Sequence, residues 1–158
     1  MGKLAETSVL VAYADDLNAW ALQQIELLET ERFAELDVQN LVEELRALAI
    51  SQEHEVESRL TMLLQHLLKW EYQPDRRSNS WRATILEQRY RIGRVIEKSP
   101  SLHRYPAEVL DKEYRLARLR AADETGLPLN RFPAACPYSA SDALDERFWP
   151  GGGGDFEE

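Results

Sequence analysis

The chain has 158 residues and carries 28 acidic and 19 basic side chains, so its formal net charge is −9 at pH 7. A chain of this length is most simply one domain, and so strong a negative charge disfavours nucleic-acid binding over most of the surface. The single cysteine, Cys136, excludes an intrachain disulfide and a cysteine-based zinc site, and no apolar run approaches the ~20 residues of a membrane span. We therefore predict a cytoplasmic protein that does not enter membranes.

The charge is unevenly distributed along the chain. Residues 1–58 carry 13 acidic and 3 basic side chains, whereas residues 69–94 carry 7 basic and 3 acidic ones. This basic window therefore has a net charge of +4 in an otherwise acidic protein. Such a window either faces acidic helices of the same molecule or binds an external anionic partner.

The first half of the chain has the apolar spacing of helices. After a start over residues 1–10 that we expect to be flexible, apolar residues recur at helical intervals. The first apolar stripe consists of Leu17, Ala21, Ile25 and Leu28, with Trp20 and Leu27 beside it. Asp37 is a suitable N-cap for a second helix over residues 38–73, whose stripe runs from Leu41 to Trp70 without Gly or Pro. The pattern leaves open whether this segment of roughly 54 Å is one helix or two.

Helix breakers organise the second half. Pro74 ends the second helix, because its ring and missing N–H are incompatible with a helix interior. Ser78 or Ser80 can cap a third helix, and a fourth extends from about Pro106 to Gly126. The buried side of the fourth helix is predicted to hold Leu110, Tyr114, Ala117 and Ala121.

A proline-rich stretch over residues 128–137 and a short final helix that ends near Trp149 complete the pattern. The fold class is therefore all-α, a bundle of about four main helices with a Pro-rich C-terminal wrap and a short final helix. The single helical domain is expected to span residues 11–149. The Gly-rich acidic end, residues 150–158, is expected to be flexible.

Short motifs are distributed over most of the chain. They are Tyr13–Trp20, Phe33–Leu45, His66–Trp70, Gln73-Pro74, Arg76-Arg77, Ser80–Arg82, Glu124–Pro128 and Phe132–Tyr138. In these motifs the chain resembles the bacterial domain-of-unknown-function family 29. The resemblance implies an all-helical fold and no assigned activity, and such proteins have suggested links to small toxin–antitoxin gene pairs. The chain departs from the family pattern at Leu17-Asn18, where Phe-Tyr is common, and at Ala49-Ile50, where Gly is common.

The segment between the second and third helices is the first candidate site, which we call the arginine junction. The N–H groups at a helix start can bind an anion, arginine binds phosphate or carboxylate through two hydrogen bonds, and aromatic rings offer flat contact surfaces. The candidate anion- or partner-binding residues are Trp70, Tyr72, Arg76, Arg77, Ser80, Trp81 and Arg82. The alternative is that the tryptophans belong to the core and the arginines pair with Asp37, Glu43 or Glu44.

No spacing in the chain predicts a metal site, a cofactor or a catalytic group. His54, His66 and His103 do not form a His-Glu-x-x-His motif, and there is no Gly-x-Ser-x-Gly motif or phosphate-binding Gly loop. Cys136 precedes Pro137 in a predicted loop and is most simply a small buried residue. We therefore predict neither a metal nor a cofactor.

These patterns favour a non-catalytic module for macromolecular interaction with a protein as its partner, and they leave the oligomeric state open. One alternative is a phosphate-handling or hydrolytic enzyme at the arginine junction, which requires a concave pocket with a base such as His66, Glu71 or Asp75. Another is a toxin-neutralising protein that uses Glu43 and Glu44 as its acidic partner face. An arginine junction that is flat or paired with its own chain favours the interaction module.

Overall fold

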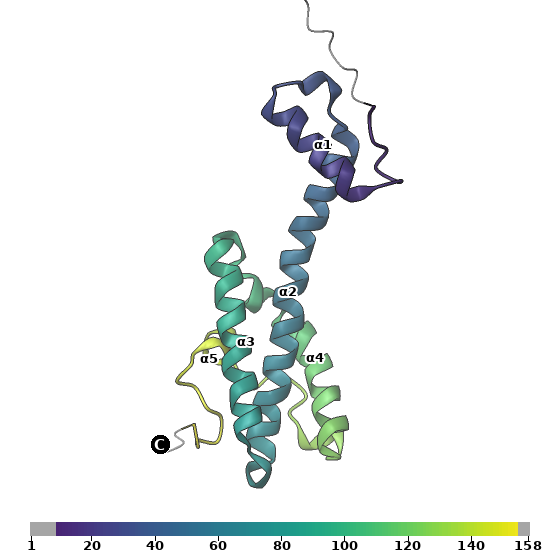
Figure 1. Ribbon diagram of the computed structural model, residues 1–158. Helices are drawn as coiled ribbons and strands as arrows, with labels where there is room; N and C mark the ends of the chain where they lie inside the picture. The colour runs from purple at the N-terminus through teal and green to yellow at the C-terminus, as the bar shows by residue number, and fades with distance from the viewer. Residues whose placement is uncertain (1–8, 155–158) are drawn as a thin grey trace, which may run out of the picture. The chain divides into compact units, whose positions relative to one another are not determined.

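The computed structural model describes residues 9–154, and all regular structure among them is helical (Figure 1). The α-helices are α1 (Leu17–Glu29), α2 (Val38–Tyr72), α3 (Asn79–Lys98), α4 (Tyr105–Thr125) and α5 (Ala140–Leu144). The short 3-10 helices between them are η1 (Phe33–Glu35), η2 (Pro74–Arg76), η3 (Pro100–Leu102) and η4 (Leu129–Arg131). Four long helices and a short final one confirm the predicted all-α fold. Within the described residues, no helix is long and apolar enough to cross a membrane.

The helix α2 is a single helix of 35 residues, so the segment that the pattern left open is not two helices. It contains no Gly or Pro that would interrupt its hydrogen bonds. Asp37 precedes α2 as predicted, and its Oδ1 accepts the backbone N–H of Asn40 at 3.3 Å. Contacts divide the chain between Ala49 and Ile50 into an N-terminal unit and a C-terminal unit, and both include part of α2. The single domain expected over residues 11–149 stays a prediction.

The N-terminal unit, described for residues 9–49, has a very small interior. Trp20, Gln24 and Leu27 are its buried residues. The Trp20 Nε1–H donates to Asp37 Oδ2 at 3.1 Å, and Gln24 Oε1 accepts the backbone N–H of Asp37 at 2.8 Å. The buried side of α1 therefore holds the start of α2 through polar contacts with one residue.

The C-terminal unit, described for residues 50–154, contains a large apolar core. Figure 1 shows α3 and α4 on either side of this part of α2. The core consists of Leu60, Leu63, Leu64, Leu67, Leu68, Trp70, Ile85, Ile92, Tyr114, Ala117, Ala121, Phe132, Tyr138 and Ala143. Burying one such leucine side chain contributes roughly 1.5–3 kcal/mol, so the stability of this unit rests on a well-packed interior.

The predicted C-terminal wrap packs on this core. Gly126 ends α4 with a φ of 69°, a left-handed conformation that glycine adopts without steric cost. Downstream, Phe132 and Tyr138 are buried, and the Tyr114 hydroxyl donates to the Pro133 carbonyl at 2.6 Å. The Arg118 guanidinium donates to the carbonyl of Phe132 at 3.0 Å. Segments without regular structure are thus held by side chains of α4.

Ser78 and not Ser80 caps α3. The Ser78 Oγ accepts the backbone N–H of Trp81 at 3.2 Å, and the exposed Ser80 is the second residue of the helix. Ser139 caps α5, because its Oγ accepts the backbone N–H of Asp142 at 3.0 Å, and this helix ends at Leu144, earlier than the predicted end near Trp149.

Candidate functional site

The aromatic residues of the arginine junction point into the C-terminal unit. Trp70 is fully buried at the end of α2, and its ring lies 4.9 Å from that of Trp149, centroid to centroid. Tyr72 packs edge-on against Phe132 at 5.3 Å. Trp81 is half-buried, and the Lys69 ammonium lies 4.5 Å from the centre of its ring. Trp70, Tyr72 and Trp81 therefore pack mainly against their own chain.

Two of the three junction arginines bind backbone carbonyls of the same chain. The Arg77 Nε–H donates to the Trp70 carbonyl at 2.8 Å, its Nη2 donates to Gly151 at 3.4 Å, and its guanidinium lies 4.9 Å from the Trp70 ring centre. Arg82 donates to the Gly154 carbonyl at 3.4 Å and lies 5.9 Å from the Trp149 ring centre. The bonds to Gly151 and Gly154 join Arg77 and Arg82 to residues more than 70 positions later.

The three carboxylates named as alternative partners of these arginines make contacts within their own unit. Asp37 accepts hydrogen bonds from Trp20 and Asn40, which lower its pKa. Glu43 forms an ion pair with Arg46 at 2.7 Å, and Glu44 accepts the hydroxyl of Tyr13. Charge sign alone did not identify these partners, since the N–H groups of a guanidinium can also donate to neutral carbonyls.

The glycine run after Trp149 lies against the arginine junction. The Trp70 Nε1–H donates to the Gly152 carbonyl at 3.0 Å. A Cβ at Gly153 would lie 2.4 Å from Nη1 of Arg77, and the φ of Gly153 is +78°. A Cβ at Gly154 would lie 2.1 Å from the indole ring of Trp149. The Trp149 ring therefore excludes a side chain at Gly154, whereas at Gly153 the positive φ favours glycine and a Cβ would force the Arg77 side chain to shift.

Arg89 of α3 is a further arginine that binds the C-terminal segment, and the sequence pattern gave no signal for it. It is buried and donates from Nε to the Ala143 carbonyl at 2.8 Å and from Nη2 to the Phe148 carbonyl at 2.6 Å. These carbonyls lie at and beyond the C-terminal end of α5, where a cation also suits the helix dipole. Removal from water lowers the pKa of Arg89 to about 10. We call Arg77, Arg82 and Arg89 the arginine clasp.

Arg76 differs from the arginine clasp. Its side chain is exposed on η2, and no hydrogen bond or ion pair holds it within the described chain. Among the bases considered for this region, Glu71 accepts the hydroxyl of Tyr138, and Asp75 is exposed. The His66 Nδ1 lies 2.8 Å from the Met62 carbonyl, and burial lowers the pKa of its imidazole. The arginine junction thus does not gather a base and free cations around one space.

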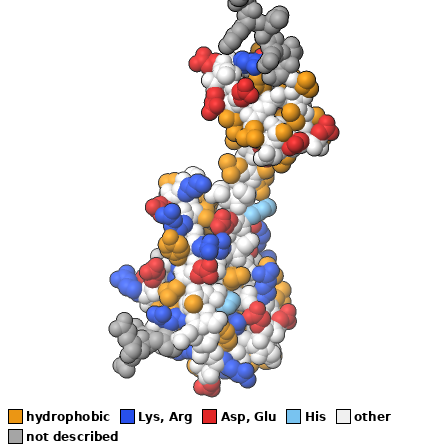
Figure 2. Space-filling model, in the orientation of Figure 1, with side chains coloured by type: hydrophobic (Ala, Val, Ile, Leu, Met, Phe, Trp, Pro, Cys, Tyr) orange, Lys and Arg blue, Asp and Glu red, His pale blue; other side chains and the backbone are white. Residues whose placement is uncertain are grey.

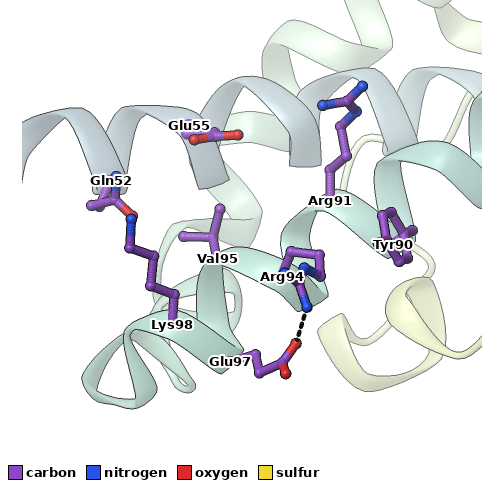
Figure 3. A pocket seen from close by; sticks show the side chains of 8 residues that line it. All are labelled: Gln52, Glu55, Tyr90, Arg91, Arg94, Val95, Glu97 and Lys98. Atoms are coloured by element: carbon purple, nitrogen blue, oxygen red, sulfur yellow. Dashed lines mark hydrogen bonds and ion pairs between the residues drawn. The ribbon is translucent and has the colours of Figure 1, made fainter.

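A polar groove of about 560 Å³ lies between α2 and α3 in the C-terminal unit (Figure 3). Its cations are Arg91, Arg94 and Lys98. Arg91 forms an ion pair with Glu87 at 2.9 Å, and Arg94 pairs with Glu97 at 3.0 Å. Two of the three cations are therefore already paired at the surface, and Lys98 is exposed without an ion pair among the described residues. Among the described residues, no group of three or more His, Cys, Asp or Glu side chains could hold a metal ion.

An apolar groove of about 570 Å³ lies in the N-terminal unit, between α1 and the start of α2. Its lining includes Leu17, Ala21, Ile25, Leu28, Leu41 and Glu44. The exposed fractions of Leu17, Ile25 and Leu28 are 51%, 48% and 45%. Figure 2 shows hydrophobic side chains gathered on this unit with acidic side chains around them.

This exposure differs from what the apolar stripes suggested. Leu45 and Leu48 continue the α2 stripe, yet their exposed fractions are 64% and 58%. The stripe becomes buried only from Val56 onward, where the C-terminal unit begins to cover it. Two helices alone bury only the residues along their common line, so apolar side chains beside that line remain in contact with water.

Glu43 and Glu44, the candidate acidic partner face, lie on α2 beside the apolar groove. Glu44 is half-buried and lines the groove, whereas Glu43 is exposed. The sequence pattern indicated Glu44 as part of a partner surface. It did not indicate the apolar residues of the groove, because their spacing predicted that they would be buried between helices.

Comparison with curated proteins finds no match, and comparison with solved structures finds none either. A family model does match the chain. It is described as "Domain of unknown function DUF29" and covers residues 12–149, which include all five α-helices. The chain therefore belongs to the DUF29 family.

Proposed function

We propose that this protein is a non-catalytic module that binds another protein through the apolar groove of its N-terminal unit. The observation that carries the proposal is the exposure of Leu17, Ile25 and Leu28 on one face of α1, beside Leu41 of α2. Contiguous apolar patches on soluble proteins mark interaction sites, since leaving them in water gains nothing for folding.

The half-exposed side chains of the groove can supply part of the energy of binding. Complete burial of a leucine or isoleucine side chain is worth roughly 1.5–3 kcal/mol. Because Leu17, Ile25 and Leu28 are about half exposed, covering them would contribute about 3–4 kcal/mol together. Further exposed apolar side chains of this unit lie outside the groove lining. They are Val9, Leu10, Leu22, Phe33, Val38, Val42, Leu45 and Leu48.

The arrangement of the arginine junction supports interaction over catalysis. Arg77 and Arg82 are engaged by carbonyls of the C-terminal segment, so an enzyme at this place would first have to displace that segment. Glu71 is occupied by Tyr138. A toxin-neutralising role differs from the proposal only in the identity of the partner, so the same experiment addresses it.

The test is site-specific photo-crosslinking in cells that express the full chain. A photoreactive phenylalanine analogue replaces Ile25, and a matched control carries it at Leu119, whose exposed fraction on α4 is 52%. We expect one protein to be crosslinked at position 25 and not at position 119, and Leu28→Asp to abolish the product. No crosslinked protein at position 25, or the same set of proteins at both positions, would refute the proposal.

A further inference from the structure

We propose that the occupant of the apolar groove is an amphipathic helix of a separate protein, with Lys and Arg flanking its apolar stripe. The inference rests on the proposed function and adds the chemistry of the partner. Three features of the N-terminal unit carry it: the shape of the groove, the satisfied backbone around it and the sign of the surrounding charge.

The groove has the dimensions of a seat for a helix. α1 has 13 residues and is therefore about 20 Å long, which matches roughly four turns of a partner helix. Ala21 lies between the larger Leu17 and Ile25 on the same face, so it leaves a depression that an apolar side chain can enter. A helix with apolar residues at i, i+3, i+4 and i+7 presents its anchors at this spacing.

The backbone around the groove favours a helical occupant over an extended one. Both walls are α-helices, whose N–H and C=O groups are bonded within each helix, so they offer no edge to which a strand could add. An extended segment would bury its own backbone polar groups against the apolar side chains. A helix satisfies its backbone internally and contributes only side chains to the contact.

The charge of the unit selects a basic partner. Residues 9–49 carry nine acidic and two basic side chains, a net charge of −7. The acidic residues are Asp15, Asp16, Glu26, Glu29, Glu31, Glu35, Asp37, Glu43 and Glu44. Both basic residues are already in ion pairs, Arg32 with Glu35 at 2.6 Å and Arg46 with Glu43 at 2.7 Å.

Two of the remaining carboxylates lie beside the apolar lining. Glu29 follows Leu28 on α1 at the edge of the lining, is exposed, and has no ion pair within the described residues, whereas Glu26 lies on the opposite side of this helix. Glu44 is part of the lining itself. Lys and Arg flanking an apolar stripe would meet these carboxylates and accelerate association, whereas a second copy would bring an equal negative charge to the same place.

The first arm of the test identifies the crosslinked segment. Mass spectrometry of the product at position 25 locates the partner peptide that reacts with the photoreactive side chain. We expect a segment with helical apolar spacing and a positive net charge. A reactive segment that is acidic or lacks that spacing, or that belongs to a second copy of this chain, overturns the inference and leaves the proposed function standing. Absence of any crosslinked protein refutes the proposed function instead.

The second arm measures binding of two 14-residue fluorescent peptides to the purified full chain by anisotropy. Both have leucines at i, i+3, i+4 and i+7, and their flanking positions are Lys and Arg in one and Glu in the other. We expect the basic peptide to bind at least about tenfold more tightly, and its affinity to fall as salt rises from about 50 to 500 mM. Equal binding of the two peptides, or no binding of either, overturns the inference.

Variants of the full chain separate the groove from general charge effects. Leu28→Asp and Leu119→Asp add the same charge, and only the first should abolish binding of the basic peptide. The double substitution Glu29→Gln and Glu44→Gln should weaken binding severalfold. A matched double substitution of Glu108 and Asp123, which are exposed on α4, should leave it unchanged. Equal losses from both double variants would overturn the assignment of the basic contacts to this surface.

Discussion

Replacing Arg89 with methionine tests how strongly the arginine clasp holds the C-terminal segment. The guanidinium donates at 2.8 Å to the carbonyl of Ala143 and at 2.6 Å to that of Phe148. Hydrogen bonds from a charged donor contribute about 1.5–3 kcal/mol each, so the two together are worth roughly 5 kcal/mol. Methionine fills similar space but leaves both carbonyls without this donor.

The loss is partly offset by the charge that no longer has to be buried. The pKa of Arg89 falls from 12.5 to about 10 because it is removed from water, which corresponds to a cost of about 3.5 kcal/mol at roughly 1.4 kcal/mol per pKa unit. The net destabilisation by Arg89→Met is therefore about 1.5 kcal/mol. For a chain of this size, this change lowers the Tm by about 3–6 °C.

The assay is thermal and urea unfolding followed by near-ultraviolet circular dichroism, with Arg91→Met as the matched control. Arg91 is on the same helix, but its side chain is 51% exposed and pairs with Glu87 at the surface, so its loss should cost no more than a few tenths of a kcal/mol. Limited proteolysis should also cut the Arg89→Met variant first after residue 138. If Arg89→Met and Arg91→Met unfold at the same temperature, the reasoning about the buried bonds is wrong.

Three further predictions concern other parts of the molecule. Gly153→Ala should lower the Tm more than Gly152→Ala, since both positions have a positive φ but only the Cβ at 153 meets Arg77; equal Tm values would contradict this. Hydrogen bonds lower the pKa of Asp37 in the folded chain, so the ionised carboxylate stabilises the fold at pH values above the pKa of the unfolded chain. This stability is lost as the pH falls through the folded pKa. In Asp37→Asn, the Tm should therefore fall less steeply with decreasing pH. Burial raises the pKa of the Cys136 thiol, so its reaction with a disulfide reagent at pH 8 should be at least about tenfold slower in the native than in the urea-unfolded chain, and equal rates would rule out the burial.

The helices themselves were largely predictable because their boundaries are set by local rules. Pro74 cannot continue a helix, Gly126 adopts the left-handed conformation that ends one, and Ser78 supplies an N-cap oxygen. Trp70, Tyr114, Ala117 and Ala121 are buried where the stripes predicted them. Each of these conclusions depends on residues a few positions apart, which a linear pattern contains in full.

The candidate site was only partly predictable. The arginine junction was correctly recognised as an unusual cluster of cations, but its partners are carbonyls of Gly151 and Gly154, and carbonyls are present at every residue. No side-chain pattern can indicate such a partner. The apolar groove was missed for a different reason. Leu28 and Leu45 have the spacing of buried residues, and spacing does not reveal whether another element covers them.

By itself, the sequence determined an all-helical chain with specified stops, an acidic first third and a basic window after the long helix. The tertiary structure decided which apolar stripes are covered and which cations are engaged. The physical reason is that helix formation depends on hydrogen bonds between residues four apart, whereas burial depends on segments brought together across more than 70 positions, as Trp70 and Gly152 are. The uncovered stripe of the N-terminal unit, and not the arginine junction, is therefore where we expect a partner to bind.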